Sequence, residues 1–299
     1  MSANIIDGKK VSKLIREQVK EDVQYWIGQG NRPPKLQAVI VGNNPASHTY
    51  VKAKTKACGE VGIESDTLKL PDTISEVQLH DTLRQLNEDD SIDGILLQLP
   101  LPGHLPSWSI IETIDYRKDV DGFHPMNMGR LTVGQPAFRP CTPAGIMELF
   151  NYYSIVTKGK HAVVIGASNI VGKPIALMIS REDGAGKATV TICHQYTKDL
   201  TRHTINADIL ISAAGSPRLI TGPMIKEGVV VLDVGINRLA DHERDSGYRL
   251  VGDCDFDSVK EKANWITPVP GGVGPMTVSM LMKNTLLAAK QAIYHDEIQ

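Results

Sequence analysis

The chain has 299 residues, of which 41% are hydrophobic, and its formal net charge is -2. This length predicts one large domain or two ordinary ones, and the apolar content is sufficient for a buried core. The near-neutral charge argues against nucleic-acid binding, and no apolar run is long enough to span a membrane. Residues 1–22 lack an apolar signal core and contain several acidic side chains. We therefore expect a cytoplasmic protein, or a mitochondrial one only if a presequence has been removed.

The first half of the chain alternates between helix and strand patterns. In chain order the predicted elements are helix 11–27, strand 36–42, helix 47–61, strand 65–71, helix 74–89 and strand 93–102. An irregular stretch rich in glycine and proline follows at 119–143, and a helix from about Pro143 leads out of this part. The alternation favours an α/β fold with a parallel sheet covered by helices.

A second alternation follows, which predicts a second α/β domain. Its strands are predicted at 161–166, 187–193, 207–215, 229–237 and 249–256. The last predicted element is a helix at 276–295 with a broad apolar face. Two α/β lobes with a cleft between them are the simplest architecture for this order.

The segment HAVVIGASNIVGKP (161–174) places two glycines and a short polar loop between a strand and a helix. Gly166 would let the backbone approach a ligand, and the helix start near Gly172 offers free N–H groups to a phosphate. Such turns also occur without a ligand, and the usual G-x-G-x-x-G spacing is absent. Later strands that end in the small loops AAGSP, DVGIN and VGDCD favour a nucleotide site.

The strand after this loop, ATVTIC, ends without the Asp or Glu that NAD sites usually place there. Ser168, His194 and Gln195 could instead face a ribose phosphate, together with Lys187 or Lys198. The sequence therefore favours NADP and leaves NAD possible. His194 could equally be an ordinary surface histidine.

Tyr50 and Lys54 lie four residues apart, so on a helix they share a face from which Lys52 and Lys56 point away. A ring beside an amine could stack a flat ligand and exchange a proton with it, although a solvated basic helix is the alternative. Gln98 interrupts an aliphatic strand near its carboxyl end, where ligands bind and where a buried amide needs partners.

In KDVDGFHP (118–125), Asp119 and Asp121 alternate around one valine. One carboxylate could accept two parallel hydrogen bonds from a flat, amidine-like heterocycle, or Asp121 could form an Asp-Gly turn. ITPVPGGVGPMT (266–277) is a stiff loop that could bring bare backbone against a ligand or simply reverse the chain.

The chain has four scattered cysteines without a C-x-x-C pair, Cys58, Cys141, Cys193 and Cys254. In an intracellular chain of this length, such a distribution predicts plain buried thiols, with neither disulfides nor a metal site.

Together these motifs resemble the bifunctional methylenetetrahydrofolate dehydrogenase/cyclohydrolase family, in order and over essentially the whole chain. The matching motifs are YVKAK (50–54), QLPLP (98–102), KDVDG (118–122), PCTPAG (140–145), GASNIVG (166–172) and PVPGGVGPMT (268–277). KDVDG and PVPGGVGPMT are highly specific.

The resemblance implies a homodimer of two-lobed subunits. An N-terminal folate-binding catalytic domain (1–142), completed by a C-terminal helix (about 277–299) that packs back on it, faces a Rossmann-type NADP-binding domain (143–276). Methylenetetrahydrofolate gives a hydride to NADP, and water opens the resulting methenyl cation to 10-formyltetrahydrofolate.

The resemblance also implies roles for single residues. Lys54 is the catalytic lysine, Gln98 assists it, Tyr50 stacks on the folate and Asp121 holds the pterin. The residues expected at the dinucleotide are Gly166, Ala167, Ser168, Gly172, His194, Gln195, Ile236 and Thr277. Those expected near the folate are Pro270, Gly271 and Gly272. No metal is implied.

Some positions depart from the family pattern. Ala167 and Gln195 stand where some relatives carry arginine or serine, and segment 180–190 resembles an insertion in the NAD-using mitochondrial branch. Lys54, which several NAD-specific relatives lack, favours both activities. The alternatives are a monofunctional NAD-dependent dehydrogenase and a non-catalytic folate- or nucleotide-binding protein. Rates with each cofactor and a separate hydrolysis assay would distinguish the first, and tight folate binding without turnover would indicate the second.

Overall fold

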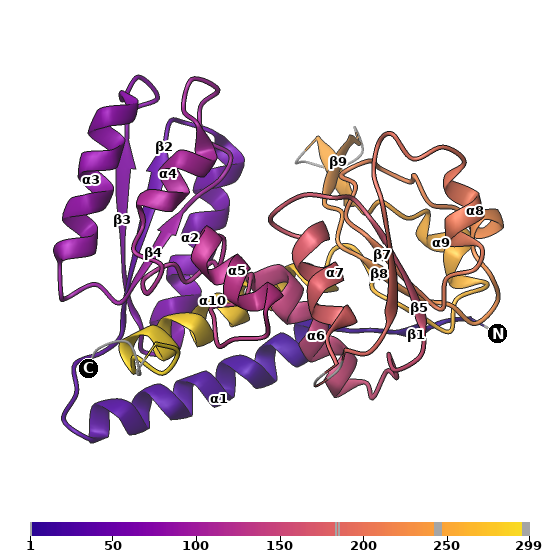
Figure 1. Cartoon of the computed structure of the whole chain (residues 1–299), viewed down its shortest axis with the longest axis horizontal. Helices are drawn as coiled ribbons and strands as arrows, with labels where there is room; N and C mark the ends of the chain where they lie inside the picture. Colours follow the sequence, from indigo (N-terminus) through magenta and orange to yellow (C-terminus); the bar gives the residue numbers. More distant parts are fainter. Residues whose placement is uncertain (1, 183, 185, 242–246, 295–299) are drawn as a thin grey trace. The chain divides into compact units, whose positions relative to one another are not determined.

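The computed structural model describes residues 2–182, 184, 186–241 and 247–294. The chain forms two compact α/β units, each built on a parallel sheet as the sequence predicts (Figure 1). The three-stranded unit comprises Lys13–Cys141 and Val278–Gln299. The six-stranded unit comprises Met1–Ser12 and Thr142–Thr277. Among the described residues, no helix combines the length and apolar character needed to cross a membrane.

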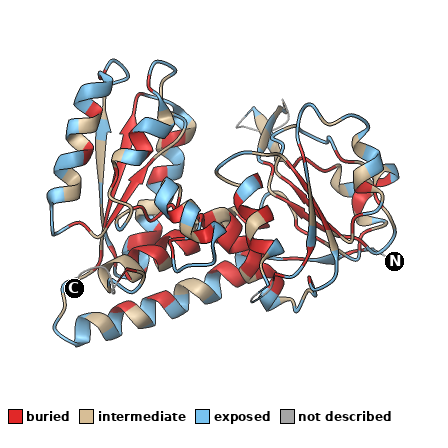
Figure 2. Cartoon of the chain, in the orientation of Figure 1, coloured by how far each residue is buried: buried red, intermediate tan, exposed pale blue. Residues whose placement is uncertain are grey.

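The three-stranded unit has the strand order β3–β2–β4. Its strands are β2 (Lys35–Val41), β3 (Glu64–Leu70) and β4 (Gly94–Leu97). The helices found in it are α1 (Gly8–Gly28, from Lys13 on), α2 (Pro45–Glu60), α3 (Glu76–Glu88), α4 (Ser107–Thr113) and α5 (Pro125–Thr132). The strands β2 and β4 are buried almost throughout, as expected of a parallel sheet with helices on its faces (Figure 2).

Local capping signals explain where the helices of this unit begin. The Asn44 side chain accepts hydrogen bonds from the N–H groups of Ala46 and Ser47, and Pro45 suits the first turn of α2. Ser75 and Gln78 form a reciprocal capping box at the start of α3. These caps fix the register of α2 and therefore which of its side chains face the sheet.

The stretch 119–143, predicted to be irregular, contains helix α5, so that prediction was wrong in part. His124 caps this helix through its ring, and Pro125 occupies its first turn. The helix is only two turns long and its apolar positions are few, so no helical period stands out in the sequence.

The C-terminal helix α10 (Val273–Ala289) contacts the three-stranded unit, which confirms the predicted packing. The buried Asn284 side chain donates to the carbonyl oxygens of Val120, at 2.8 Å, and Arg139, at 3.2 Å. The helix ends six residues before the predicted end at 295, a position that lies outside the described residues, as do 296–299 and two positions of segment 180–190.

The six-stranded unit has the order β1–β11–β8–β7–β5–β6, with every neighbouring pair parallel. Its strands are β1 (Asn4–Ile5), β5 (His161–Ile165), β6 (Thr189–Cys193), β7 (Ile209–Ser212), β8 (Val230–Asp233) and β11 (Trp265–Ile266). Its helices are α6 (Cys141–Tyr152), α7 (Gly172–Ser180), α8 (Leu200–Thr204) and α9 (Phe256–Lys260), with a 3₁₀ turn at Gly222–Met224. The chain leaves β5 for β6 on one side and then returns to β7 on the other. This reversal makes a topological switch point between β5 and β7, where such sheets bind ligands.

Segment 249–256 was predicted to be another strand of this sheet, and that prediction was wrong. Its first residues form β10 (Tyr248–Val251), which pairs antiparallel with β9 (Asn237–Ala240) in a separate two-stranded sheet. The short strands β11 and β1 extend the main sheet instead, with Asn4 paired to Trp265. This pairing places the first residues in the six-stranded unit, whereas they were predicted to lie in the first domain.

Candidate active site

Lys54 and Gln98 form a direct contact in the three-stranded unit. The Nζ atom of Lys54 donates to Oε1 of Gln98 at 3.3 Å. Gln98 directly follows β4, and its Nε2 donates to the carbonyl oxygen of Leu99 at 2.6 Å, which turns the amide oxygen toward the lysine. Lys54 is half-buried, whereas Lys52 and Lys56 are exposed. The alternative of a solvated basic helix therefore fits those two lysines and fails for Lys54.

The two carboxylates of KDVDG have different environments. Asp119 accepts hydrogen bonds from the backbone N–H groups of Gly122 and His124 and from the Asn127 side chain, at 3.1, 2.7 and 2.9 Å. Asp119 therefore organises this turn, which was the alternative role predicted for Asp121. A parallel bridge between Asp119 and Ile95 of β4 directs the chain toward the end of that strand.

Asp121 is 9% exposed. Burial raises the pKa of its carboxyl above the ordinary value, while the positive charge of Lys54 and a hydrogen bond from the Cys141 thiol act in the opposite direction. An amine, an amide and a buried carboxylate from three separate segments thus belong to one electrostatic cluster. All four cysteines are buried and free, as predicted.

Tyr50 lies one helical turn before Lys54 on α2 and is 46% exposed. An exposed aromatic ring thus lies one turn from a half-buried amine. This placement agrees with the predicted shared face of the helix, and it makes stacking on a flat ligand geometrically possible.

A cavity of about 940 Å³ opens at the carboxyl ends of β5, β6 and β7 in the six-stranded unit. The loops after these strands supply its walls. The predicted dinucleotide residues that line it are Gly166, Ala167, Ser168, His194 and Gln195. They meet at the switch point of the sheet, the position where an open α/β sheet binds a dinucleotide.

Backbone packing explains both glycines of the turn after β5. A Cβ atom on Gly166 would lie 2.2 Å from the carbonyl oxygen of Ala213, and one on Gly172 would lie 1.9 Å from that of Gly166. The Ser168 hydroxyl accepts from the N–H groups of Val171 and Gly172, at 3.2 and 3.3 Å, at the start of α7. Gly172 is buried and does not line the cavity, so its part is to let the turn pack closely.

The remaining predicted cofactor residues lie elsewhere in the six-stranded unit. Ile236 follows β8 and is 45% exposed, and the Thr277 hydroxyl is 2.8 Å from that of Thr142. The lining of the cavity includes Lys173, which the sequence analysis had left without a role, in place of Lys187 or Lys198. Its position directly after the second glycine of the motif was the available signal.

The loop 268–272 packs backbone against backbone at the start of α1. Lys9 N–H donates to the carbonyl oxygen of Gly271 at 3.1 Å, and Gly272 N–H donates to that of Pro268 at 2.8 Å. Gly271 and Gly272 are buried and Pro270 is exposed. Close packing explains Gly272, because a Cβ there would lie 2.6 Å from the carbonyl oxygen of Pro268, and a φ of +113° explains Gly271.

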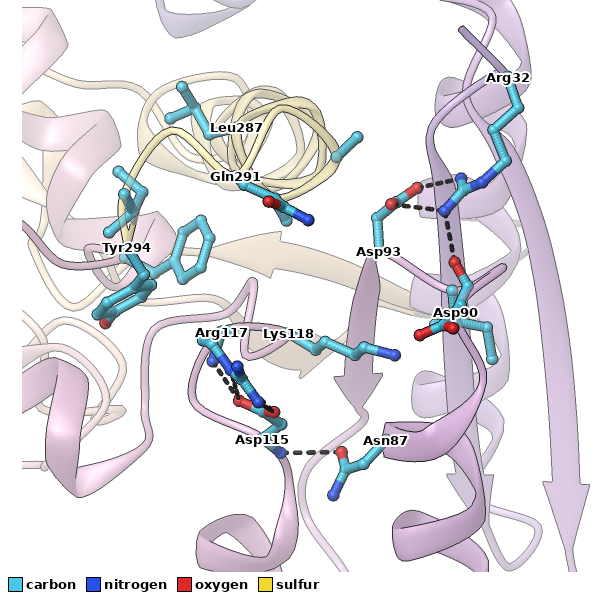
Figure 3. A pocket seen from close by; sticks show the side chains of 15 residues that line it. Arg32, Asn87, Asp90, Asp93, Asp115, Arg117, Lys118, Leu287, Gln291 and Tyr294 are labelled. Atoms are coloured by element: carbon cyan, nitrogen blue, oxygen red, sulfur yellow. Dashed lines mark hydrogen bonds and ion pairs between the residues drawn. The ribbon is translucent and has the colours of Figure 1, made fainter. Parts of the chain in front are cut away.

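A second cavity, of about 510 Å³, lies near the amino-terminal ends of β2 and β4 (Figure 3). Arg32 makes two hydrogen bonds to Asp93, at 2.7 and 2.9 Å, and Arg117 pairs with Asp115. The Lys118 ammonium donates to a backbone carbonyl at 2.8 Å. The two arginines are paired with carboxylates of the cavity wall, and Lys118, the first residue of KDVDG, is bonded to backbone, so we assign this cavity a structural role.

An amine–amide–carboxylate cluster on one α/β unit and a switch-point cavity on another are typical of a two-domain enzyme that uses a dinucleotide. Residues 6–121 match the catalytic domain of tetrahydrofolate dehydrogenase/cyclohydrolase, and residues 140–293 match the NAD(P)-binding domain of the same family. The chain belongs to the tetrahydrofolate dehydrogenase/cyclohydrolase family.

Individual relatives match over nearly the full chain. The bifunctional protein FolD of Nautilia profundicola is 53% identical over 287 residues, which are 96% of this chain and 97% of the relative. The crystal structure of the bifunctional methylenetetrahydrofolate dehydrogenase/cyclohydrolase from Campylobacter jejuni has 50% identity and a TM-score of 0.91, covering 97% of this chain and 100% of its own. The Trypanosoma brucei dehydrogenase-cyclohydrolase, solved with NADP and an inhibitor, has 38% identity and a TM-score of 0.92, covering 98% and 99%.

Proposed function

We propose that this chain is a bifunctional folate enzyme. It oxidises 5,10-methylenetetrahydrofolate to 5,10-methenyltetrahydrofolate with NADP and then hydrolyses that product to 10-formyltetrahydrofolate. The observation that carries the proposal is the contact between Lys54 and Gln98, in one cluster with the buried Asp121. The proposed chemistry is supported by relatives that are named bifunctional and are about 50% identical to this chain over nearly its whole length.

The three-stranded unit binds the folate in this proposal. The Asp121 carboxylate accepts two parallel hydrogen bonds from the amidine-like edge of the pterin, which a planar donor pair favours. The exposed ring of Tyr50 stacks on the ring system of the pterin. We also assign backbone contacts with the substrate to Pro270, Gly271 and Gly272.

Hydrolysis requires proton transfers that Lys54 can carry out. Water adds to the methenyl carbon, the bond from that carbon to one ring nitrogen breaks, and the departing nitrogen gains a proton. Lys54 takes one proton of the water and passes it to the departing nitrogen, while the second water proton is released to solvent as the formyl C=O forms. Gln98 keeps the amine directed toward the reacting carbon through the 3.3 Å hydrogen bond.

The dinucleotide cavity fits NADP by size and by polarity. Its volume of about 940 Å³ is at the upper end of small-molecule sites. When bound, NADP supplies the acceptor for the hydride. The loop after β6 presents His194 and Gln195 in place of the carboxylate that would bind NAD ribose hydroxyls, and Lys173 adds a positive charge for a phosphate. We place Ala167, Ser168, Ile236 and Thr277 at this cofactor as well.

We further propose that the protein works as a cytoplasmic homodimer, as the family resemblance implies. Its four buried, free cysteines fit a reducing compartment. Sedimentation at several protein concentrations tests the assembly. A monomer at every concentration would exclude the dimer.

A steady-state assay with methylenetetrahydrofolate, run with NADP and with NAD, tests the function. Hydrolysis of methenyltetrahydrofolate is followed separately, without a nicotinamide cofactor. We expect both activities and a higher kcat/KM with NADP. Oxidation with NAD and no hydrolysis would indicate a monofunctional dehydrogenase, and tight folate binding without either reaction would indicate a non-catalytic protein.

A further inference from the structure

Asp253 lies after β10 and is completely buried. Its carboxylate accepts hydrogen bonds from three consecutive backbone N–H groups of the loop after β7. The distances to the nitrogens of Ala214, Gly215 and Ser216 are 2.7, 3.1 and 3.0 Å. A buried carboxylate with this many charge-assisted bonds fixes the path of the loop that it contacts.

A second buried aspartate holds Asp253 in place. The Asp233 carboxylate, at the end of β8, accepts from the backbone N–H groups of Asp253 and Cys254, at 2.9 and 2.8 Å. Two glycines make room for the pair. A Cβ atom on Gly235 would lie 2.1 Å from the Asp253 carboxylate, and one on Gly252 would lie 1.9 Å from that of Asp233.

The loop that Asp253 holds is a wall of the dinucleotide cavity, because Ala213, Ala214 and Ser216 line it. The N–H groups of this loop point inward to the carboxylate. In a trans peptide the C=O group points opposite to the N–H, so the carbonyl oxygens of residues 213–215 turn away from Asp253. With its N–H groups bound to Asp253, the loop can offer a ligand in the cavity only backbone acceptors, which suit amide N–H donors such as those of a carboxamide.

We propose that Asp253 is a positioning residue for the dehydrogenase reaction. It sets the shape and the acceptor polarity of the loop at 213–216, and through that loop it determines how the nicotinamide cofactor is seated. This inference rests on the proposed function. Lys54, Gln98 and Asp121 belong to the other unit, so hydrolysis does not depend on this loop.

The test is Asp253→Asn, which keeps the size of the side chain but replaces one acceptor oxygen by a donor that faces the loop N–H groups. We expect kcat/KM for NADP to fall about 10- to 100-fold, as for other losses of cofactor alignment. Hydrolysis of methenyltetrahydrofolate should stay within about twofold, because it needs no redox cofactor. Direct binding of NADP, measured by calorimetry, should weaken in parallel.

Asp208→Asn is the matched control, because Asp208 lies at the opposite end of β7. Its carboxylate accepts from His161 N–H at 2.8 Å and pairs with Lys226 at 2.6 Å. We expect this variant to lower the melting temperature without changing kcat/KM for NADP. Equal losses of kcat/KM in the two variants would overturn the proposal, because they would indicate general destabilisation of the unit.

Asn237→Ala serves as the second variant, since its side chain donates to Asp253 at 3.0 Å from a partly exposed position. We expect a loss of about threefold in NADP affinity, the effect of one hydrogen bond. If Asp253→Asn does not fold, unchanged affinity in Asn237→Ala would refute the proposal. If the native protein lacks both enzyme activities, the proposed function fails, and calorimetry with NADP still decides the role of Asp253.

Discussion

The Oε1 atom of Gln98 accepts a hydrogen bond from Lys54, while the amide nitrogen of the same side chain is bound to the Leu99 carbonyl oxygen. This second bond prevents the amide from turning its nitrogen toward the lysine. The Lys54 amine therefore meets the amide oxygen of Gln98, and the rest of the amine remains for other partners. Such a fixed partner is what a residue that transfers protons requires.

Replacement of Lys54 by methionine should abolish hydrolysis and leave part of the dehydrogenase activity. Methionine retains much of the length of the lysine side chain but cannot exchange a proton, so we expect methenyltetrahydrofolate hydrolysis to fall by at least about 10²-fold. Lys52→Met is the control, because Lys52 is exposed on the same helix. Hydrolysis at the native rate in the Lys54 variant would exclude Lys54 as the proton carrier.

The pH dependence of kcat/KM for methylenetetrahydrofolate should reflect the ionisation of Asp121. Burial raises the pKa of this carboxyl, so it becomes protonated, and loses its paired acceptors, at a higher pH than an ordinary aspartate at about 3.9. The acid limb of kcat/KM for methylenetetrahydrofolate should therefore lie above that value. Asp121→Asn should lower kcat/KM throughout and remove this limb. If the acid limb lies at the same pH in Asp121→Asn, another group is responsible for it.

The raised pKa of Asp121 also makes the stability of the protein depend on pH. Because the pKa of Asp121 is higher in the folded than in the unfolded chain, its contribution to the free energy of unfolding falls as pH rises between these two values. Removal of the charge in Asp121→Asn should therefore raise stability most at alkaline pH. Urea unfolding of both proteins at pH 5 and pH 8 measures the difference.

The periodic segments of the fold could be predicted from the sequence, and the short ones could not. Strand β2 is an apolar run interrupted only by Gln37 after its first residue, Lys35, and was found within one residue at each end. Strands β1 and β11 have two residues each, too few for any pattern, and exist because they pair with each other and with β8. The hairpin β9–β10 was missed because alternation in a strand does not reveal its partner.

The residues of the site also divide into those that could be recognised from the sequence and those that could not. Side chains with an unusual chemical type for their position, such as Gln98 in an aliphatic strand, could be recognised from sequence. Asp253 could not, because its importance comes from backbone donors of a loop about 40 residues away in the chain. The sequence also singles out Gly166 and Gly172 as cofactor residues, and close backbone packing accounts for both glycines as fully as a ligand would.

Gly172→Ala should therefore destabilise the six-stranded unit even without cofactor. The added methyl group would lie 1.9 Å from the Gly166 carbonyl oxygen, so the turn must move. We expect a loss of about 1–3 kcal/mol in the free energy of unfolding, as for overpacked sites. Gly59→Ala is the control, since a Cβ there meets nothing within 4 Å and lies in helix α2. Equal melting temperatures for the two variants would contradict the packing argument.

Asn284→Ala should loosen the attachment of α10 to the three-stranded unit. The variant removes the buried donor that the carbonyl oxygens of Val120 and Arg139 share. Val120 keeps a bond from the Cys141 thiol at 3.3 Å, so the loss at Arg139 dominates and costs about 1–3 kcal/mol. Since Val120 adjoins Asp121, affinity for folate should fall together with the free energy of unfolding in urea. Asn206→Ala, at an exposed position, should change stability by less than about 0.5 kcal/mol. A native unfolding curve for Asn284→Ala would indicate that the helix is held by its apolar contacts alone.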